Sequence, residues 1–174
     1  MNGVTKPDHV DRLRGQWARE APDIDTTPMT ILGRVYRLSN LIRPSIEATF
    51  AGFGLDRGEF DVISTLRRSG PPYRLTPTDL YTLLMISSGG LSHRLVRLEK
   101  AGLVAREKSA EDGRSLIVAL TPKGQKLAEE AFRADMASEM QFLEKLSPEK
   151  REALADLLRE LVRGVEEGGD AEAV

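Results

Sequence analysis

The stretch between residues 76 and 120 constrains the fold most, because the spacing of its apolar residues changes from helical to extended partway along. Its first half predicts two short helices. Thr76-Pro77 has the form of a helix cap followed by a proline in the first turn, and Ser87 can cap the second helix. That second helix ends at Gly102, a typical helix stop, and carries an apolar stripe of Leu91, Leu95 and Leu98.

Two strands are expected directly after this helix. Residues 103–108 and 115–120 have strand character, and Leu116-Ile117-Val118 is strongly β-prone. The polar turn between them contains Asp112-Gly113, a frequent hairpin turn. Two short helices joined by a tight turn and followed by a β-hairpin predict a winged helix-turn-helix, which is a DNA-binding arrangement. The predicted fold is mainly α, with a small β-hairpin wing.

Helices are also expected on the N-terminal side of this region. Residues 9–20 can form a short amphipathic helix, and a second helix begins at the cap Thr27 with Pro28 in its first position. That helix runs towards Phe50, and Pro44 within it predicts a kink or a break. The sequence therefore places an extension helix and a longer helix before the DNA-binding region.

The helix that precedes the short pair has a clear start. Asp56 and Glu59 have the spacing of a capping box, in which each side chain accepts a hydrogen bond from the backbone of the other. We therefore divide the chain into an N-terminal extension and dimerisation helix at 1–52, a winged helix-turn-helix at 53–122, and C-terminal dimerisation helices with a tail at 123–174.

The C-terminal part is expected to be helical up to its last residues. Thr121-Pro122 opens a long helix that reaches about Leu146, and Ser147 caps a last helix that reaches about Arg163. The Gly- and Glu-rich residues 164–174 are expected to fray.

Composition excludes several kinds of function. The 174 residues include no cysteine, so disulfides, thiol nucleophiles and Cys-ligated metals are ruled out, and two histidines are few for a zinc site. The chain has no Gly-rich phosphate loop, nucleophile elbow or metal-ligand cluster, so neither an enzyme nor a cofactor is expected. It also lacks an apolar run of 18 residues and a signal peptide, which favours the cytoplasm and no membrane partner.

The distribution of charge matters more than the net charge of −2. Residues 74–114 carry seven Lys or Arg against five Asp or Glu, whereas residues 123–174 carry eight against thirteen. Because DNA affinity depends on the local patch that neutralises phosphates, an acidic C-terminal segment does not argue against DNA binding.

The second helix of the pair has an outward face that suits the major groove. Opposite the leucine stripe, a helical wheel places small, polar and basic residues that can donate to base edges or phosphates. An ordinary solvated helix face is the alternative. The DNA-contacting residues predicted on this helix are Ser88, Ser92, His93 and Arg97.

The tip of the hairpin predicts a second DNA contact. Arg114 follows the turn directly, so its long side chain can reach the minor groove. Asp112 can orient the guanidinium through a charge-assisted hydrogen bond. In the alternative interpretation, the Asp-Gly pair only forms the turn.

Taken together, the motifs resemble the MarR family of bacterial regulators over about residues 32–161. The resemblance rests on Ser87–Gly102 continued by Leu-Val-Ala-Arg, on Asp112-Gly113-Arg114, and on Leu120–Gly124. It implies a homodimer with interlocking N- and C-terminal helices, whose reading helices and wings bind an inverted repeat in double-stranded DNA.

A narrower resemblance concerns the urate-responsive branch of this family, the PecS- and HucR-like regulators. It rests on Gly70–Leu75 and on an N-terminal helix that contains a tryptophan. The resemblance implies a small anionic effector such as urate, bound by Trp17, Asp61, Arg94 and Arg106. Alternatively, Trp17 only packs its helix and Asp61 is only solvated.

The helical wheel agrees in part with this ligand set. Arg94 lies about 60–70° from the leucine stripe, so its side chain can turn back towards the protein. Asp61 points away from the apolar stripe of its own helix, so it can pair with Arg94 only if another element covers that side. We hypothesise that an anion competes for Arg94 and Arg106 and displaces Asp61, which moves the reading helix.

Two alternatives remain from the residues themselves. A different aromatic or polycarboxylate anion would satisfy the same arginines. A helical protein-interaction module without a DNA role would explain the long terminal helices, although it would leave the basic helix face and the wing without a purpose.

Overall fold

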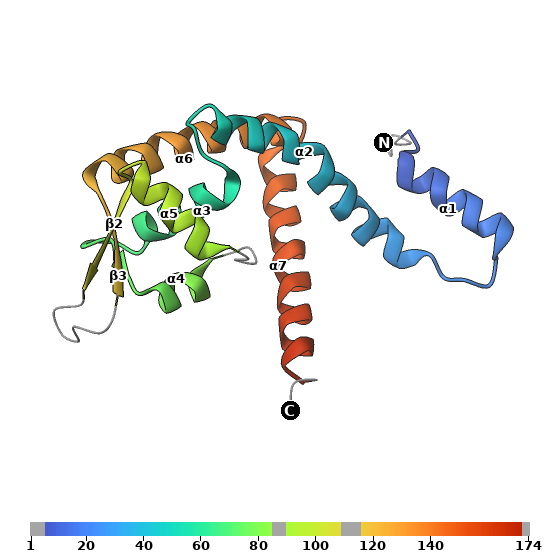
Figure 1. Ribbon diagram of the computed structural model, residues 1–174. Coiled ribbons are helices and arrows are strands. Elements are labelled where there is room, and N and C mark those ends of the chain that lie inside the picture. Colours follow the sequence, from blue (N-terminus) through green and yellow to red (C-terminus); the bar gives the residue numbers. More distant parts are fainter. Residues whose placement is uncertain (1–5, 85–89, 109–115, 172–174) are drawn as a thin grey trace. The chain divides into compact units, whose positions relative to one another are not determined.

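The computed structural model describes residues 6–84, 90–108 and 116–171 and divides into two compact units, Met1–Ala48 and Thr49–Val174. The predicted fold, helical with a small antiparallel sheet, is confirmed (Figure 1). Among the described residues no helix is both long and apolar enough to cross a membrane. The elements in chain order are α1 His9–Glu20, the π-helical turn η1 Met29–Gly33, α2 Arg34–Ala51, α3 Arg57–Arg68, β1 Arg74–Leu75, α4 Pro77–Leu83, α5 Leu91–Lys100, β2 Val104–Lys108, β3 Leu116–Leu120, α6 Pro122–Leu143 and α7 Pro148–Ala171.

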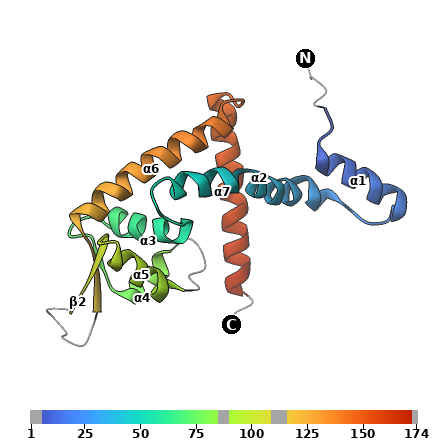
Figure 2. The same cartoon turned by 45° about the horizontal axis from the view of Figure 1, so that its top comes forward.

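Helix α3 is the centre of the C-terminal unit. It lies between α6 on one side and α4 and α5 on the other, and it also contacts β3 (Figures 1 and 2). Complete burial of an aliphatic side chain contributes about 1.5–3 kcal/mol, so this core holds the helix pair and the sheet together. The fully buried aliphatic side chains are Val62, Ile63, Leu66, Leu80, Leu98 and Val118.

Local capping explains where several helices begin. In α3 the predicted capping box is present: Asp56 Oδ1 accepts from the N–H of Glu59 at 2.8 Å, and Glu59 Oε2 accepts from the N–H of Asp56 at 2.9 Å. Thr76 Oγ1 caps α4 in the same way, and Thr121 Oγ1 caps α6. Each cap satisfies a backbone donor that has no partner inside its own helix.

The sheet has one strand more than the predicted hairpin. Strands β2 and β3 pair antiparallel with Val104 opposite Leu120, as expected, and the strand order is β1-β3-β2. The additional strand β1 pairs Arg74 with Ala119 and Leu75 with Val118. Two residues are too few to show the alternating pattern of a strand in the sequence, and β1 is a strand only because it pairs with β3. The predicted turn at 109–115 lies outside the described residues.

The start and course of the helix before α3 differ from expectation. Thr27 is not the cap but is itself helical, and Asp25 Oδ1 accepts from its N–H at 2.9 Å. Pro44 does not break α2, which continues to Ala51. A proline removes one backbone donor from a helix, and the remaining hydrogen bonds are sufficient to carry the helix past it.

Three further helix boundaries are corrected. Helix α5 begins at Leu91 after Gly90, whose φ of 89° is left-handed, while the predicted cap Ser87 lies outside the described residues. Helix α6 ends at Leu143 rather than near 146. Helix α7 continues to Ala171, so the tail does not fray from residue 164; the glutamates there are good helix formers.

In the N-terminal unit, α1 packs on the start of the following helix. Val10 is buried against Gly33. Arg34 forms ion pairs with Asp8 at 2.8 Å and Asp11 at 2.7 Å, the two residues that also form the capping box of α1. Trp17 is 50% exposed on α1.

Two glycines offer a matched test of this packing. A methyl group at Gly124 would overlap the backbone oxygen of Leu103 and lie 2.8 Å from the Leu120 side chain, whereas Gly164 has nothing within 4 Å. Gly124→Ala should lower the free energy of unfolding by about 1–3 kcal/mol. Gly164→Ala should raise it by about 0.5–1 kcal/mol, because alanine favours a helix. Urea unfolding at one protein concentration checks both; similar effects of the two variants would contradict the close packing of Gly124 on Leu103 and Leu120.

Candidate nucleic-acid interface and effector site

Helix α5 has the two faces that its sequence predicts. Leu91, Leu95 and Leu98 are buried, and the opposite side is open to solvent. Of the predicted DNA-contacting residues, the structure places Ser92, His93 and Arg97 on this exposed side. Ser88, Asp112 and Arg114 lie outside the described residues.

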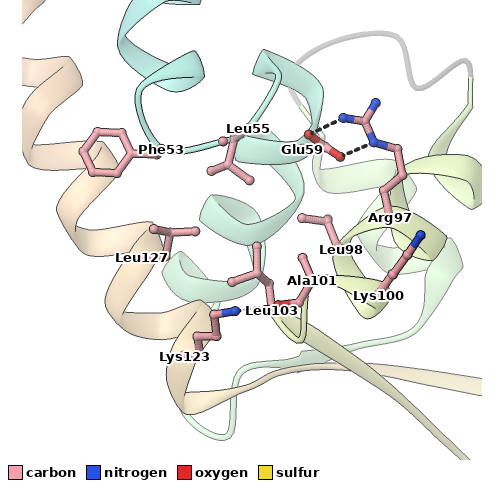
Figure 3. Close-up of a pocket in the computed structure, with 11 residues that line it drawn as sticks. Phe53, Leu55, Glu59, Arg97, Leu98, Lys100, Ala101, Leu103, Lys123 and Leu127 are labelled. Atoms are coloured by element: carbon pink, nitrogen blue, oxygen red, sulfur yellow. Dashed lines mark hydrogen bonds and ion pairs between the residues drawn. The ribbon is translucent and has the colours of Figure 1, made fainter.

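Arg97 also attaches α5 to α3. Its Nε lies 2.8 Å from Glu59 Oε1, and one terminal nitrogen lies 3.3 Å from Glu59 Oε2 (Figure 3). The other terminal nitrogen lies 3.5 Å from Asp56 Oδ2. Glu59 is only 3% exposed, so this is a nearly buried carboxylate with a half-exposed cation. Sequence reasoning recognised Glu59 as a cap but missed its second role, because its partner lies 38 residues further along the chain.

Arg94 turns back towards α3, as the helical wheel predicts. Its guanidinium lies so close to Gly58 that a methyl group at that position would overlap it. Asp61, one helical turn after Gly58, is half-buried, and the positive charges of Arg57 and Arg94 act on it. Burial raises the pKa of Asp61 above its ordinary value, and these arginines oppose the rise. The structure thus brings Arg94 and Asp61 to the same side of α3.

Helix α6 supplies the cover that Asp61 needs. Asp135 on α6 is 6% exposed, and its Oδ1 has no hydrogen-bond partner in the described part of the chain. Burial and the neighbouring carboxylate of Glu139 raise the pKa of Asp135 to about 6, and Asp61 adds to this effect while Arg57 opposes it. Sequence reasoning missed Asp135. A signal was present, because it continues the buried stripe of α6, which is Gly124, Ala128 and Ala131.

Arg106 lies on β2 at the base of the wing, opposite Val118. Its Nε lies 3.2 Å from Glu99 Oε2 of α5, close enough for an ion pair but not aligned as a hydrogen bond. Its Nε and one terminal nitrogen are buried without a hydrogen-bond partner among residues 6–84, 90–108 and 116–171. Trp17, the fourth predicted ligand residue, belongs to the N-terminal unit, where it borders a pocket of about 190 Å³ with Ile24 and Met29.

A larger cleft lies where α3, α5 and α6 meet (Figure 3). Its volume is about 530 Å³, and apolar and basic side chains line it together. The described part of the chain contains no group of His, Cys, Asp and Glu that could hold a metal ion. The residues that line the cleft are Phe53, Gly54, Leu55, Glu59, Arg97, Leu98, Lys100, Ala101, Leu103, Lys123 and Leu127.

The helix pair, the exposed face of α5 and the β2-β3 hairpin define a winged helix-turn-helix regulator of transcription. The MarR family model matches residues 53–115. The HTH-type transcriptional regulator PecS of Dickeya dadantii is 36% identical over 149 residues, which are 86% of this chain and 90% of PecS. This chain therefore belongs to the MarR family, whose members are transcription regulators and not enzymes.

Solved structures agree with this assignment. AbsC of Streptomyces coelicolor is 26% identical with a TM-score of 0.70, and the alignment covers 82% of this chain and 97% of AbsC. Sco3205 of the same organism, solved in complex with DNA, is 24% identical with a TM-score of 0.69 over 82% of this chain and 94% of its own. Bordetella bronchiseptica BpsR, whose DNA binding is regulated by 6-hydroxynicotinic acid, is 24% identical with a TM-score of 0.64. The alignment covers 77% of this chain and 94% of BpsR.

The raised pKa of Asp135 predicts how stability depends on pH. The folded chain holds this proton up to a pH of about 6, whereas an unfolded aspartate releases it near 3.8, so the free energy of unfolding falls as the pH rises through this interval. Asp135→Asn removes this loss. At pH 7.5 the free energy of unfolding of the variant should exceed that of the wild type by about 1 kcal/mol, and at pH 5 the difference should be smaller.

Urea unfolding at both pH values measures this effect. Asp23→Asn, at an exposed position of the N-terminal unit, is the matched control and should leave the pH dependence unchanged. Parallel pH profiles for the wild type and Asp135→Asn would contradict the assignment.

Proposed function

We propose that this protein is a homodimeric repressor that binds an inverted-repeat operator and is released from it by a small anionic ligand, of which urate is the leading candidate. The exposed side of α5 reads the major groove through Ser92 and His93, and the wing reaches the minor groove through Arg114. The observation that carries this proposal is the attachment of α5 to α3 by Arg97 and Glu59, which presents a small polar face on a rigid support.

Dimerisation rests on apolar side chains that a single chain leaves exposed. A stable soluble protein covers large apolar patches, and interlocking terminal helices from two chains would cover these. The N-terminal helices before α3 and the C-terminal helices α6 and α7 carry the dimer interface in this proposal. Exposed apolar residues on α2, α6 and α7 include Val35, Leu38, Leu41, Phe132, Met136, Met140, Leu154, Leu157, Leu161 and Val165.

Unsatisfied polar atoms support an effector that both donates and accepts hydrogen bonds. Asp61 Oδ2 and Asp135 Oδ1 are buried acceptors without partners, and Arg106 offers buried donors, all within the described residues. Leaving such groups unpaired costs about 1–3 kcal/mol each, so a ligand that satisfies them gains affinity. A heterocycle that carries both N–H donors and an anionic oxygen, such as urate, fits both kinds of atom.

The effector acts through Arg94. A ligand that binds Arg94 and Arg106 competes with Asp61 for the guanidinium beside Gly58, and α5 then loses one of its attachments to α3. The coupling free energy between an effector site and a second site is usually about 1–3 kcal/mol. The loss of one charged contact of α5 is enough to supply a coupling of that size. Regulation of BpsR by 6-hydroxynicotinic acid supports an aromatic heterocyclic acid as the effector class.

Two alternatives are distinguished by simple measurements. A different aromatic or polycarboxylate anion would release the operator where urate does not. A helical interaction module without a DNA role would show no affinity for the chain's own upstream DNA even at low salt.

Operator binding should depend steeply on salt. Each neutralised phosphate contributes a slope of about 0.9 in a plot of log affinity against log salt concentration.

Ser92→Ala with His93→Ala should reduce the preference for operator over random DNA by about tenfold, because these residues face the bases. Lys150→Gln on α7 is the control with an exposed, distant side chain. Fluorescence anisotropy measures both effects, and an unchanged preference would refute the proposed reading face.

Urate should release the wild-type protein from operator DNA in a gel-shift titration. Asp61→Asn should weaken operator binding or the urate response at least fivefold, because the variant cannot hold Arg94 as a charge partner. Asp23→Asn serves as the control.

Trp17→Ala tests whether the N-terminal helix takes part in sensing, since a purely packing role leaves the response to urate unchanged.

If no soluble concentration of urate releases the operator, urate is not the effector. If Asp61→Asn behaves as the wild type in both measurements, Asp61 is not the lever that moves α5.

A further inference from the structure

Arg67, in the last turn of α3, connects helix α6 with the segment that leads into strand β1. Its Nε donates to Glu129 Oε1 of α6 at 3.1 Å, and one terminal nitrogen donates to the same oxygen. The other terminal nitrogen donates to the hydroxyl oxygen of Tyr73 at 3.2 Å, and the guanidinium carbon lies 4.8 Å from the centre of the Tyr73 ring. The end of α3, the start of β1 and helix α6 therefore meet at one side chain.

The backbone of Tyr73 has a conformation that a bulky residue rarely adopts. Its φ of 61° lies in the left-handed region, and among the described residues it is the only one other than glycine with a positive φ. Such a conformation persists only where the surroundings determine it. The N–H of Tyr73 donates to the backbone oxygen of Gly70 at 2.7 Å, and Arg67 holds the side chain. The contact with Arg67 thus helps to set the path of the chain from α3 into β1.

Tyr73 also begins the pairing that holds the sheet together. Its backbone oxygen accepts from the N–H of Leu120, the last residue of β3, at 3.0 Å. Strand β1 follows directly, and a terminal nitrogen of Arg74 lies 3.4 Å from a carboxylate oxygen of Glu107 on β2. This ion pair ties the two outer strands to each other across β3. A displacement of Tyr73 is therefore passed on to both strands of the hairpin.

Arg67 and Glu129 are suited to direct the sheet more than to stabilise the fold. The hydrogen bond from Arg67 holds the pKa of Glu129 below its ordinary value, so the pair is charged at neutral pH. All three nitrogens of the guanidinium point to Glu129 or Tyr73, so Arg67 contacts the protein and not a DNA phosphate. Both charged side chains are more than a third exposed, and solvent weakens such a pair. The defined geometry of the guanidinium remains.

The hairpin of β2 and β3, which is the wing, has another attachment on a different element. Arg106 of β2 lies 3.2 Å from Glu99 of α5. Attachment at two points fixes the angle of a hairpin, whereas attachment at one point leaves it able to tilt. Loss of the contacts of Arg67 would therefore tilt the wing without detaching it.

We propose that Arg67 and Tyr73 are positioning residues for DNA recognition, and that with Glu129 they form a clamp that fixes the angle of the wing. The inference rests on the proposed function, in which the wing reaches the minor groove. Without the clamp the wing tilts out of that groove, while α5 keeps its own attachment through Glu59 and Arg97. The clamp thus governs recognition in the minor groove and leaves recognition in the major groove intact.

Two DNA duplexes separate these two kinds of recognition. One is the chain's own upstream DNA, and in the other every adenine is replaced by 2,6-diaminopurine. The replacement adds an amino group in the minor groove, as guanine does, and leaves the major-groove edge of the base unchanged. Fluorescence anisotropy of the full-length protein at one salt concentration gives the ratio of the affinities for the natural and the modified duplex. A loss of stability alone lowers both affinities and leaves this ratio unchanged.

Three variants test the clamp. Glu129→Ala removes its partner on α6. Glu130→Ala is the matched control, because Glu130 is the next residue, is exposed, lies 3.9 Å from Lys126 of the same helix, and its loss changes the net charge equally. Tyr73→Phe removes only the hydroxyl group and keeps the ring beside Arg67.

We expect the wild type and Glu130→Ala to bind the natural duplex about fivefold or more tightly than the modified one, because the added amino group obstructs the wing. For Glu129→Ala this ratio should fall below about twofold, and for Tyr73→Phe it should fall to about half the wild-type value or less. A wild-type ratio in Glu129→Ala would overturn the proposal. If that variant does not fold, a wild-type ratio in Tyr73→Phe would overturn it.

Failure of the proposed function gives a different result. Equal affinity of the wild type for the two duplexes would contradict the minor-groove contact of the wing, and the inference would fall with it. A wild type that distinguishes the duplexes, together with a Glu129→Ala variant that does so equally well, would contradict the clamp alone.

Discussion

The ion pair between the Glu59 carboxylate and Arg97 is the interaction that fixes the position of α5 on α3. The carboxylate completes the cap of α3 by accepting from Asp56, and it binds Arg97 of α5 while only 3% of the residue is exposed. Arg97 is half-exposed, so solvent screens part of the attraction, but loss of Arg97 leaves the buried carboxylate without its charge partner. The same side chain thus fixes where α3 begins and where α5 lies.

A second contact joins the same two helices, and it differs in one respect. Arg94 lies three residues before Arg97 on α5 and packs on Gly58 near Asp61. Both oxygens of Glu59 have partners, whereas Asp61 and Asp135 each keep a buried oxygen that no described residue hydrogen-bonds. In the proposed function, a ligand would therefore gain more at the Asp61 side than at the Glu59 side. This asymmetry is why the proposed effector is placed at the Arg94 contact and not at the Glu59 contact.

Local signals in the sequence were sufficient for most of the fold. The capping box at Asp56 and the threonine caps at 76 and 121 act within one helical turn, so a short stretch of sequence specifies them. Strand β1 could not be predicted, because two residues become a strand only by pairing with β3. Helix α5 begins at Leu91 after a left-handed Gly90, a start that no side chain of the described residues caps.

The site was predicted less completely than the fold, for a related reason. In the sequence Glu59 is recognisable only as a cap residue and Arg97 only as a cation on the outward face of its helix, and only the packing of α5 on α3 brings them together. Asp135 resembles a solvated helix residue until its place in the small-residue stripe of α6 is noticed. Ligand residues implied by family resemblance fall on both compact units, and packing within the C-terminal unit joins two of them, Asp61 and Arg94.

A double-mutant cycle between Glu59 and Arg97 tests most directly whether operator binding depends on this attachment. Operator affinity is measured for the wild type, Glu59→Gln, Arg97→Gln and the double variant at one salt concentration. We predict a coupling energy of at least about 1 kcal/mol, so that Arg97→Gln costs roughly fivefold less affinity once Glu59 is already changed. Additive effects of the two substitutions would show that Arg97 acts independently of Glu59 and would contradict the account.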